Sequence, residues 1–203
     1  MKRILIILMG LAVAASIGAC SSLPGQSGWV SLIDGNNGLE NFDRVGDANW
    51  RAEGNAIVAD SAKVGSFLVS KNSYKDFQIR AEFWADHTTN SGIFIRLSDA
   101  KTVTAANSYE VNIFDQRPDP LYGTGAIVDF AKVSPMPKAG GKWNSYLVTA
   151  TGDRIVVVLN GVQTVDLRDS KFASGPVALQ FANGAQNAPG GAIKWRSVQI
   201  RPM

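Results

Sequence analysis

Short runs of alternating apolar and polar residues recur along this 203-residue chain, and they constrain its fold more than any other feature. Successive side chains of a β-strand point to opposite faces of a sheet, so alternation predicts strands with one buried face. The run at residues 77–84 alternates in this way, and turns such as Asn160-Gly161 separate such runs. Runs with helical periodicity are scarce. The pattern favours an all-β sandwich or jelly roll with one domain at residues 29–203.

Two neighbouring runs, at residues 91–98 and 108–114, each combine an apolar face with a face that carries a charged or amide side chain. A solvent-exposed strand face normally carries several charges, so these mixed faces are typical of the lining of a shallow site. The apolar faces hold Ile93, Ile95 and Leu97 in the first run and Tyr109, Val111 and Ile113 in the second. The mixed faces hold Gly92, Phe94 and Arg96 in the first run and Glu110, Asn112 and Phe114 in the second.

The N-terminal segment predicts export and lipid anchoring. Residues 1–19 have a basic start, an apolar run and a small-residue end, which is typical of a signal peptide. The sole cysteine, Cys20, follows at once, and Ile17-Gly18-Ala19-Cys20 resembles the bacterial lipobox in which the cysteine is lipidated. The alternatives are a signal peptide with an incidental cysteine and a short membrane helix.

Residues 20–28 form a lipid-anchored tether in this interpretation, since they are mostly small. Ser21 stands where an Asp usually retains such proteins at the inner membrane. We therefore expect a bacterial cell-envelope protein on the outer membrane, facing the periplasm, with membrane contact only through the N-terminal lipid.

Charge argues against nucleic acid as a partner. The formal net charge is +3, but Lys2 and Arg3 lie in the leader, which leaves 18 basic against 17 acidic residues. No basic patch of the kind that binds nucleic acid is evident.

Short motifs from residue 29 onward match a known pattern in their order and spacing. They are Trp29-Val30-Ser31-Leu32-Ile33-Asp34-Gly35, Asn49-Trp50, Tyr74-Lys75-Asp76-Phe77, Asn90-Ser91-Gly92-Ile93-Phe94-Ile95-Arg96, Tyr109-Glu110-Val111-Asn112, Gly125-Ala126-Ile127, Trp143-Asn144, Leu159-Asn160-Gly161, Gly175-Pro176-Val177-Ala178-Leu179-Gln180 and Trp195-Arg196. In these motifs the chain resembles the 3-keto-disaccharide hydrolase domain family. The resemblance implies a concanavalin A-like jelly-roll sandwich of two antiparallel sheets, with carbohydrate on the concave sheet. Family members often carry a His soon after the Leu-Gln pair, where this chain has Phe181 and Ala182.

The resemblance implies a glycoside-cleaving hydrolase that acts on sugars oxidised at C3. A C3 ketone acidifies the C2 hydrogen, so a base can remove it, the glycosidic oxygen can leave C1, and water can add back. This route needs a carboxylate base and a cation or donor near the enolate oxygen. We expect Glu110 as the base and Arg96 as the second catalytic residue. The expected substrate-binding residues are Asn112, Gln180, Glu82, Asn90, Phe94 and Trp84.

Simpler roles compete for the same residues. Glu110 and Arg96 can form a structural ion pair across adjacent strands. Asn112 and Gln180 can serve ordinary hydrogen bonds. Core packing is the simpler role for Phe94 and Trp84, and a solvated loop position is the simpler role for His87.

Other functions compete as well. A second enzymatic hypothesis is two-carboxylate hydrolysis, which needs Glu82 and Glu110 about 5–10 Å apart on neighbouring strands. A non-catalytic carbohydrate-binding lipoprotein and a structural envelope protein are the non-enzymatic alternatives. We expect no cofactor, although Asp115 and Asp119 can bind a structural divalent cation.

Overall fold

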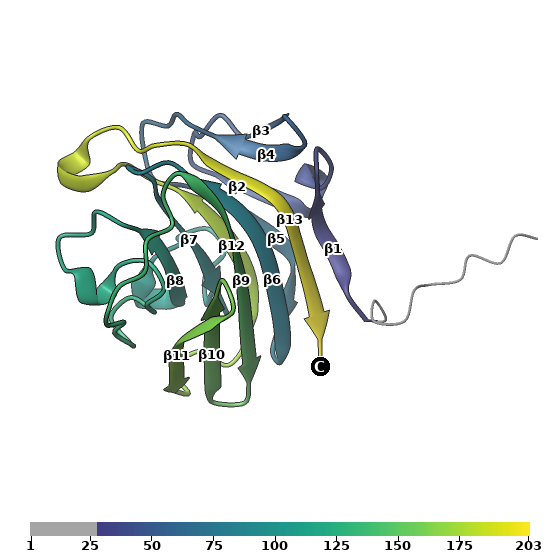
Figure 1. The fold of residues 1–203 in the computed structure, drawn as a ribbon. Helices are drawn as coiled ribbons and strands as arrows, with labels where there is room; N and C mark the ends of the chain where they lie inside the picture. Colours follow the sequence, from purple (N-terminus) through teal and green to yellow (C-terminus); the bar gives the residue numbers. More distant parts are fainter. Residues whose placement is uncertain (1–27) are drawn as a thin grey trace, which may run out of the picture.

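The computed structural model describes residues 28–203, which form two antiparallel sheets (Figure 1). The all-β sandwich expected from the alternating runs is therefore confirmed. Within the described residues, no helix is long and apolar enough to cross a membrane. The strands are β1 (Val30–Asp34), β2 (Phe42–Val45), β3 (Arg51–Glu53), β4 (Ala56–Ala59), β5 (Ser66–Tyr74), β6 (Phe77–Ala85), β7 (Asn90–Ile95), β8 (Tyr109–Phe114), β9 (Lys142–Thr151), β10 (Arg154–Leu159), β11 (Val162–Arg168), β12 (Gly175–Phe181) and β13 (Ile193–Pro202). Short 3-10 helices are η1 (Leu39–Asn41), η2 (Ala105–Asn107), η3 (Pro120–Tyr122) and η4 (Ala185–Asn187).

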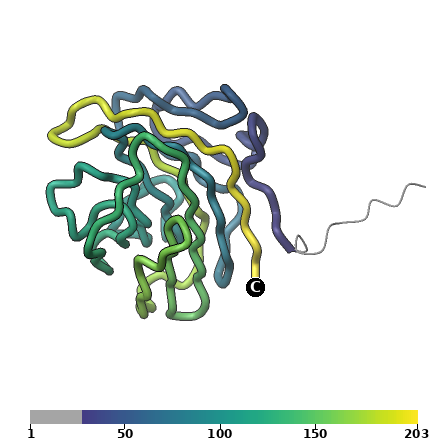
Figure 2. The backbone as a smooth tube through the Cα atoms, in the orientation of Figure 1, coloured from purple at the N-terminus to yellow at the C-terminus, as the bar shows by residue number. Residues whose placement is uncertain are grey.

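The larger sheet has eight strands and the smaller has five. The larger sheet runs β11-β10-β9-β6-β13-β4-β3, and β1 pairs with β13 outside this path. The smaller sheet runs β2-β5-β12-β7-β8. Because β1 and β13 pair, the first and last described strands lie side by side, as the purple and yellow ends of the tube show (Figure 2).

The core lies between the inner faces of the two sheets. Alternation along each strand supplies the apolar residues of this core. Ile93 and Val111 are 0% exposed on the smaller sheet, and Phe83 and Trp195 are 0% exposed on the larger. Phe83 also stacks on Tyr146 with ring centroids 5.2 Å apart. Burial of such apolar surface supplies most of the driving force for folding.

The turn between β10 and β11 has the conformation that its sequence predicts. Asn160 and Gly161 both have positive φ, at 51° and 82°, as a two-residue hairpin turn requires. Leu159 pairs directly with Val162 across this turn.

The segment between β8 and β9 continues the smaller sheet at its β8 edge. Ile127 bridges to Val111, and the Val128 amide donates to the Glu110 carbonyl at 3.0 Å. This segment therefore lies beside the strand that carries the carboxylate expected to act as the base.

Candidate functional site

The register of the smaller sheet gathers polar residues on its outer face. Glu110 on β8 pairs with Phe94 on β7, and Asn112 pairs with Gly92. Phe94 in turn pairs with Ala178 on β12, so Gln180, two residues further along β12, shares this outer face. Paired residues of antiparallel strands point to the same side of a sheet. The structure therefore brings Glu110, Asn112 and Gln180 together on one face.

Glu110 occupies a space that a glycine leaves open. A Cβ on Gly92 would lie 3.4 Å from Cγ of Glu110 and 3.0 Å from the Val111 carbonyl oxygen. Glu110 is only 7% exposed, and no residue from 28 to 203 donates a hydrogen bond to its carboxylate. The alternative of an ion pair with Arg96 is not found.

Burial raises the pKa of Glu110 from 4.5 to about 7. The positive charge of Arg117 opposes this increase, and the negative charge of Asp129 adds to it. A carboxylate that is partly ionised near neutral pH has the property that a general base needs.

Arg117 is a candidate site residue that sequence reasoning missed. It follows β8 in the loop, and its charge acts on Glu110. Its guanidinium has no ion-pair partner among the described residues. Arg117 lies in a Pro-rich loop outside any alternating run, so periodicity could not identify it. The signal that could have done so is its position three residues after the strand that carries Glu110.

The amide side chains of the face have different surroundings. Asn112 donates from Nδ2 to the Tyr122 carbonyl at 2.7 Å, and Asn90 donates to the Asn183 carbonyl at 2.6 Å. Both asparagine side chains therefore link strands of the smaller sheet to neighbouring loops. Oδ1 of Asn112 and Oε1 of Gln180 are buried without a hydrogen-bond partner in the described part of the chain.

Phe94 forms the apolar floor beside these polar groups. It is 1% exposed and packs edge-on against Phe67, with ring centroids 5.3 Å apart. Packing therefore accounts for Phe94, and its ring presents no open face to a sugar. An open cavity of about 720 Å³ adjoins the floor at Val69 and Leu97, and Lys71 and Lys101 also line it.

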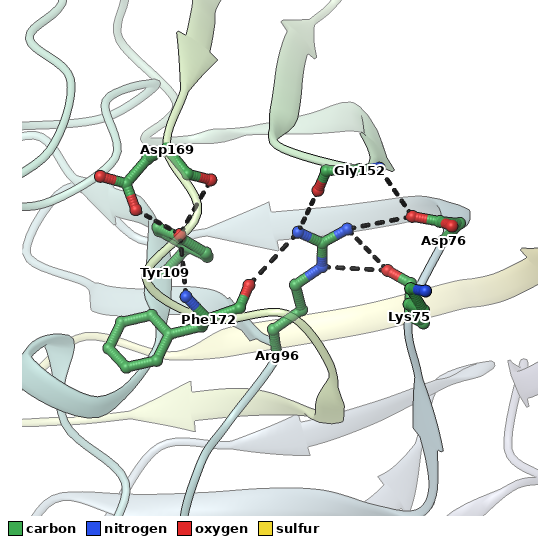
Figure 3. A network of polar contacts seen from close by, with 7 residues as sticks. All are labelled: Lys75, Asp76, Arg96, Tyr109, Gly152, Asp169 and Phe172. Carbon is green, nitrogen blue, oxygen red and sulfur yellow. Dashed lines mark hydrogen bonds and ion pairs between the residues drawn. The ribbon is translucent and has the colours of Figure 1, made fainter.

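The expectation that Arg96 shares a face with Phe94 is wrong. Arg96 has φ 55°, in the left-handed region, so the alternation of β7 ends there. Leu97 instead joins the outer cluster around Phe94. The Arg96 side chain is fully buried, and its guanidinium contacts backbone carbonyls and Asp76 (Figure 3).

Glu82 and Trp84 do not share a surface with Glu110, contrary to expectation. Both lie on β6 in the larger sheet, with side chains on its outer face. Glu82 accepts a hydrogen bond from Nε of Arg196 at 2.9 Å, and Lys194 lies over the Trp84 ring. Since β6 and β8 belong to different sheets, the neighbouring strands that two-carboxylate hydrolysis requires are not found.

The two loop aspartates organise the backbone around them. The Asp115 carboxylate accepts from the amides of Ala139 and Gly140, and Asp119 accepts from the Leu121 amide at the start of η3. Among residues 28–203, no three His, Cys, Asp or Glu side chains form a group that can hold a metal ion. Cys20, with the predicted signal peptide and most of the tether, lies outside the described residues.

The raised pKa of Glu110 predicts a pH-dependent stability. The folded state favours the neutral carboxyl, so this contribution is complete below pH 4.5 and is lost as pH rises through about 7. Glu110→Gln keeps a neutral side chain at every pH. We expect the wild type to lose about 3 kcal/mol relative to Glu110→Gln between pH 4 and pH 9 in urea titrations. Parallel pH profiles for the two proteins would contradict the raised pKa.

Comparisons with known proteins agree with this architecture. A putative glycosyl hydrolase from Parabacteroides distasonis superposes with a TM-score of 0.68 at 23% identity, over 86% of this chain and 99% of that one. The carbohydrate-binding module CBM66 from Bacillus subtilis superposes with a TM-score of 0.55 at 15% identity, over 87% and 97% of the two chains. At these identities the likeness shows the fold alone. No curated protein gives a significant match.

The family profile described as 3-keto-alpha-glucoside-1,2-lyase-like domain matches residues 28–201. The match spans all thirteen strands except the last residue of β13. The resemblance noted in the sequence motifs is confirmed, and the chain belongs to the 3-keto-alpha-glucoside-1,2-lyase-like domain family.

Proposed function

We propose that this protein cleaves glycosides oxidised at C3, by removal of the C2 proton, elimination at C1 and hydration. One observation carries the proposal: Glu110, a buried carboxylate with its pKa raised to about 7 and no hydrogen-bond donor among residues 28–203, lies on a sheet face of a 3-keto-alpha-glucoside-1,2-lyase-like domain. A base whose pKa lies near neutral pH is suited to remove a proton that a neighbouring ketone makes acidic.

The proposed reaction is an elimination followed by a hydration. The Glu110 carboxylate takes the C2 proton, and the electrons of that C–H bond form the C2–C3 enolate. The enolate then collapses, a C1–C2 double bond forms, and the C1–oxygen bond breaks. The leaving oxygen takes a proton, for which protonated Glu110 is a source. Water then adds across the C1–C2 double bond and completes net hydrolysis.

Arg117 takes the electrostatic role in this proposal that was expected of Arg96. Its positive charge acts on Glu110, so it is available to stabilise the enolate oxygen and to hold Glu110 ionised. Gln180, whose buried amide oxygen has no partner within residues 28–203, is suited to accept a hydrogen bond from a sugar hydroxyl.

Anchoring in the cell envelope is part of the proposal. The lipobox-like Ile17-Gly18-Ala19-Cys20 supports lipidation of Cys20, and Ser21 supports placement at the outer membrane, facing the periplasm. The proposed substrate is then a 3-keto-glycoside that reaches this compartment.

A product assay in deuterated water tests the reaction. The domain is incubated with a 3-keto-glucoside and with the unoxidised parent glucoside, and sugars and aglycone are followed by NMR. We expect aglycone release from the keto sugar only, with deuterium at C2 of the released sugar beyond that of an enzyme-free control. Release from the parent glucoside without C2 deuterium would contradict elimination.

The second candidate is a non-catalytic carbohydrate-binding lipoprotein. The similarity of fold to CBM66 and the presence of Phe181 and Ala182 after Gln180 favour it. Glycan binding without any product from either glucoside would support this candidate over the enzyme.

A further inference from the structure

Three tryptophans on the outer face of the larger sheet each lie beneath a cationic side chain. Trp84 on β6 pairs directly with Trp143 on β9, and Trp143 is 40% exposed. Trp29, which precedes β1, lies on the same side because its ring is covered by Arg80 of β6. None of these tryptophans belongs to the candidate site on the smaller sheet.

Four cations accompany these rings. Lys194 Nζ lies 4.9 Å from the Trp84 ring centroid, and Arg196 Cζ lies 4.3 Å from that of Trp143. The Cζ atoms of Arg80 and Arg201 lie 4.4 Å and 5.1 Å from the Trp29 ring centroid. We call this surface the Trp–cation face; it comprises Trp29, Trp84 and Trp143 with Arg80, Lys194, Arg196 and Arg201.

The residues of the Trp–cation face carry a net positive charge. Its four cations are accompanied by one carboxylate, Glu82, which pairs with Arg196. Of the 18 basic and 17 acidic residues beyond the leader, this leaves 14 basic and 16 acidic residues for the rest of the domain. The face thus carries a net charge of +3 on a domain whose remainder is slightly negative. Such an asymmetry orients a protein on a negatively charged surface.

We propose that the Trp–cation face docks on an anionic lipid surface. Tryptophan favours the headgroup level of a bilayer, where its ring is partly apolar and its N–H meets water. Arg and Lys are attracted to anionic lipids. A neutral glycan would gain no Coulomb attraction from the net positive charge, whereas an anionic lipid surface would.

The start of the domain fits this orientation. Trp29 lies nine residues after Cys20, and nine residues span at most about 30 Å. If Cys20 carries lipid, as the proposed function holds, this tether keeps Trp29 near the bilayer. Glu110, on the outer face of the other sheet, then points away from the membrane toward soluble substrate.

Vesicle co-sedimentation tests the docking without the lipid anchor. The test uses residues 28–203, because the family profile matches residues 28–201 and the core of the described residues lies within 32–200. We expect this unit to bind phosphatidylcholine vesicles that contain phosphatidylglycerol, and not vesicles of phosphatidylcholine alone. Binding should weaken between 0.1 M and 1 M salt, where the screening length falls from ~10 Å to ~3 Å.

A matched pair of double variants distinguishes the effect of the Trp–cation face on binding from the effect of total charge. Lys194→Gln/Arg196→Gln removes two charges from the Trp–cation face, and Lys71→Gln/Lys101→Gln removes two from the cavity on the other sheet. Each charge near an anionic surface contributes roughly fivefold in affinity, so the first variant should bind roughly 25-fold more weakly. The second should bind as the wild type does.

Three outcomes would overturn the docking proposal. One is the absence of binding to anionic vesicles. Another is an equal loss in both double variants, which would mean that net charge alone acts. The third is tighter binding to polygalacturonate, a soluble polyanionic glycan, than to vesicles, if Lys194→Gln/Arg196→Gln weakens the binding to polygalacturonate as well. All three leave the reaction at Glu110 unaffected, because the assay involves no substrate.

Discussion

Replacing Arg96 with methionine is expected to lower the free energy of unfolding by about 3–5 kcal/mol. Methionine fills much of the same volume but donates no hydrogen bond. The Arg96 guanidinium is 0% exposed and donates to the carbonyls of Lys75, Gly152 and Phe172. Removing the donor leaves these carbonyls without that partner, and an unpaired buried polar group is costly.

Arg96 has a large expected effect because it joins segments that are distant in sequence (Figure 3). Its Nη2 lies 2.7 Å from the Lys75 carbonyl in the β5–β6 turn, and Nη1 lies 2.8 Å from the Gly152 carbonyl in the β9–β10 turn. Asp76 completes the network, since it pairs with Arg96 and accepts from the Gly152 amide. One side chain therefore links the end of β7 in the smaller sheet to the β5–β6 connection between the two sheets and to the β9–β10 turn of the larger sheet.

Urea unfolding of matched variants measures this effect. Arg154→Met removes an exposed guanidinium that pairs with Asp166 through two hydrogen bonds, so it should change stability little. Arg96→Lys keeps the charge with fewer donors and should fall between wild type and Arg96→Met. If Arg96→Met yields no folded protein, Arg96→Lys still supplies the measurement. Equal stability of Arg96→Lys, Arg154→Met and wild type would show that the network is not essential.

The sequence predicted most of the fold because strand alternation depends on local sequence. The run at residues 77–84, which lies in β6, and the apolar faces of β7 and β8 were found in this way. Alternation fails where the backbone leaves the β region, and Arg96 at φ 55° is such a position. Unlike the Asn160-Gly161 turn, the sequence around Arg96 has no turn signal that marks it for a left-handed conformation, so Arg96 was assigned to the wrong face.

The candidate site was predicted only in part, because periodicity is a signal within single strands. Periodicity identifies which residues of one strand share a face, and it placed Glu110 and Asn112 together. It does not tell which strands share a sheet, so Glu82 and Trp84 were assigned to a surface that they do not join. It also says nothing of loops, so Arg117 was missed.

Replacing Glu110 with glutamine is expected to reduce turnover of a 3-keto-glucoside by about 10²–10⁴-fold. Glutamine preserves the shape of the side chain in the space beside Gly92, but it cannot accept the C2 proton. The matched control is Glu82→Gln, which removes a carboxylate from the outer face of the other sheet and should leave turnover unchanged. Steady-state release of aglycone measures both variants.

The pH profile separates a base from a residue that only supports the fold. A base must be ionised, so wild-type kcat/KM should rise with pH and level off above about 7, the raised pKa of Glu110. In the same range the ionised carboxylate lowers the stability of the wild type, so activity and stability should change in opposite directions. Glu110→Gln should lose the activity and keep the stability at high pH. A purely structural Glu110 would instead give a variant whose activity and stability change together, and full turnover in a stable Glu110→Gln variant would refute its role as the base.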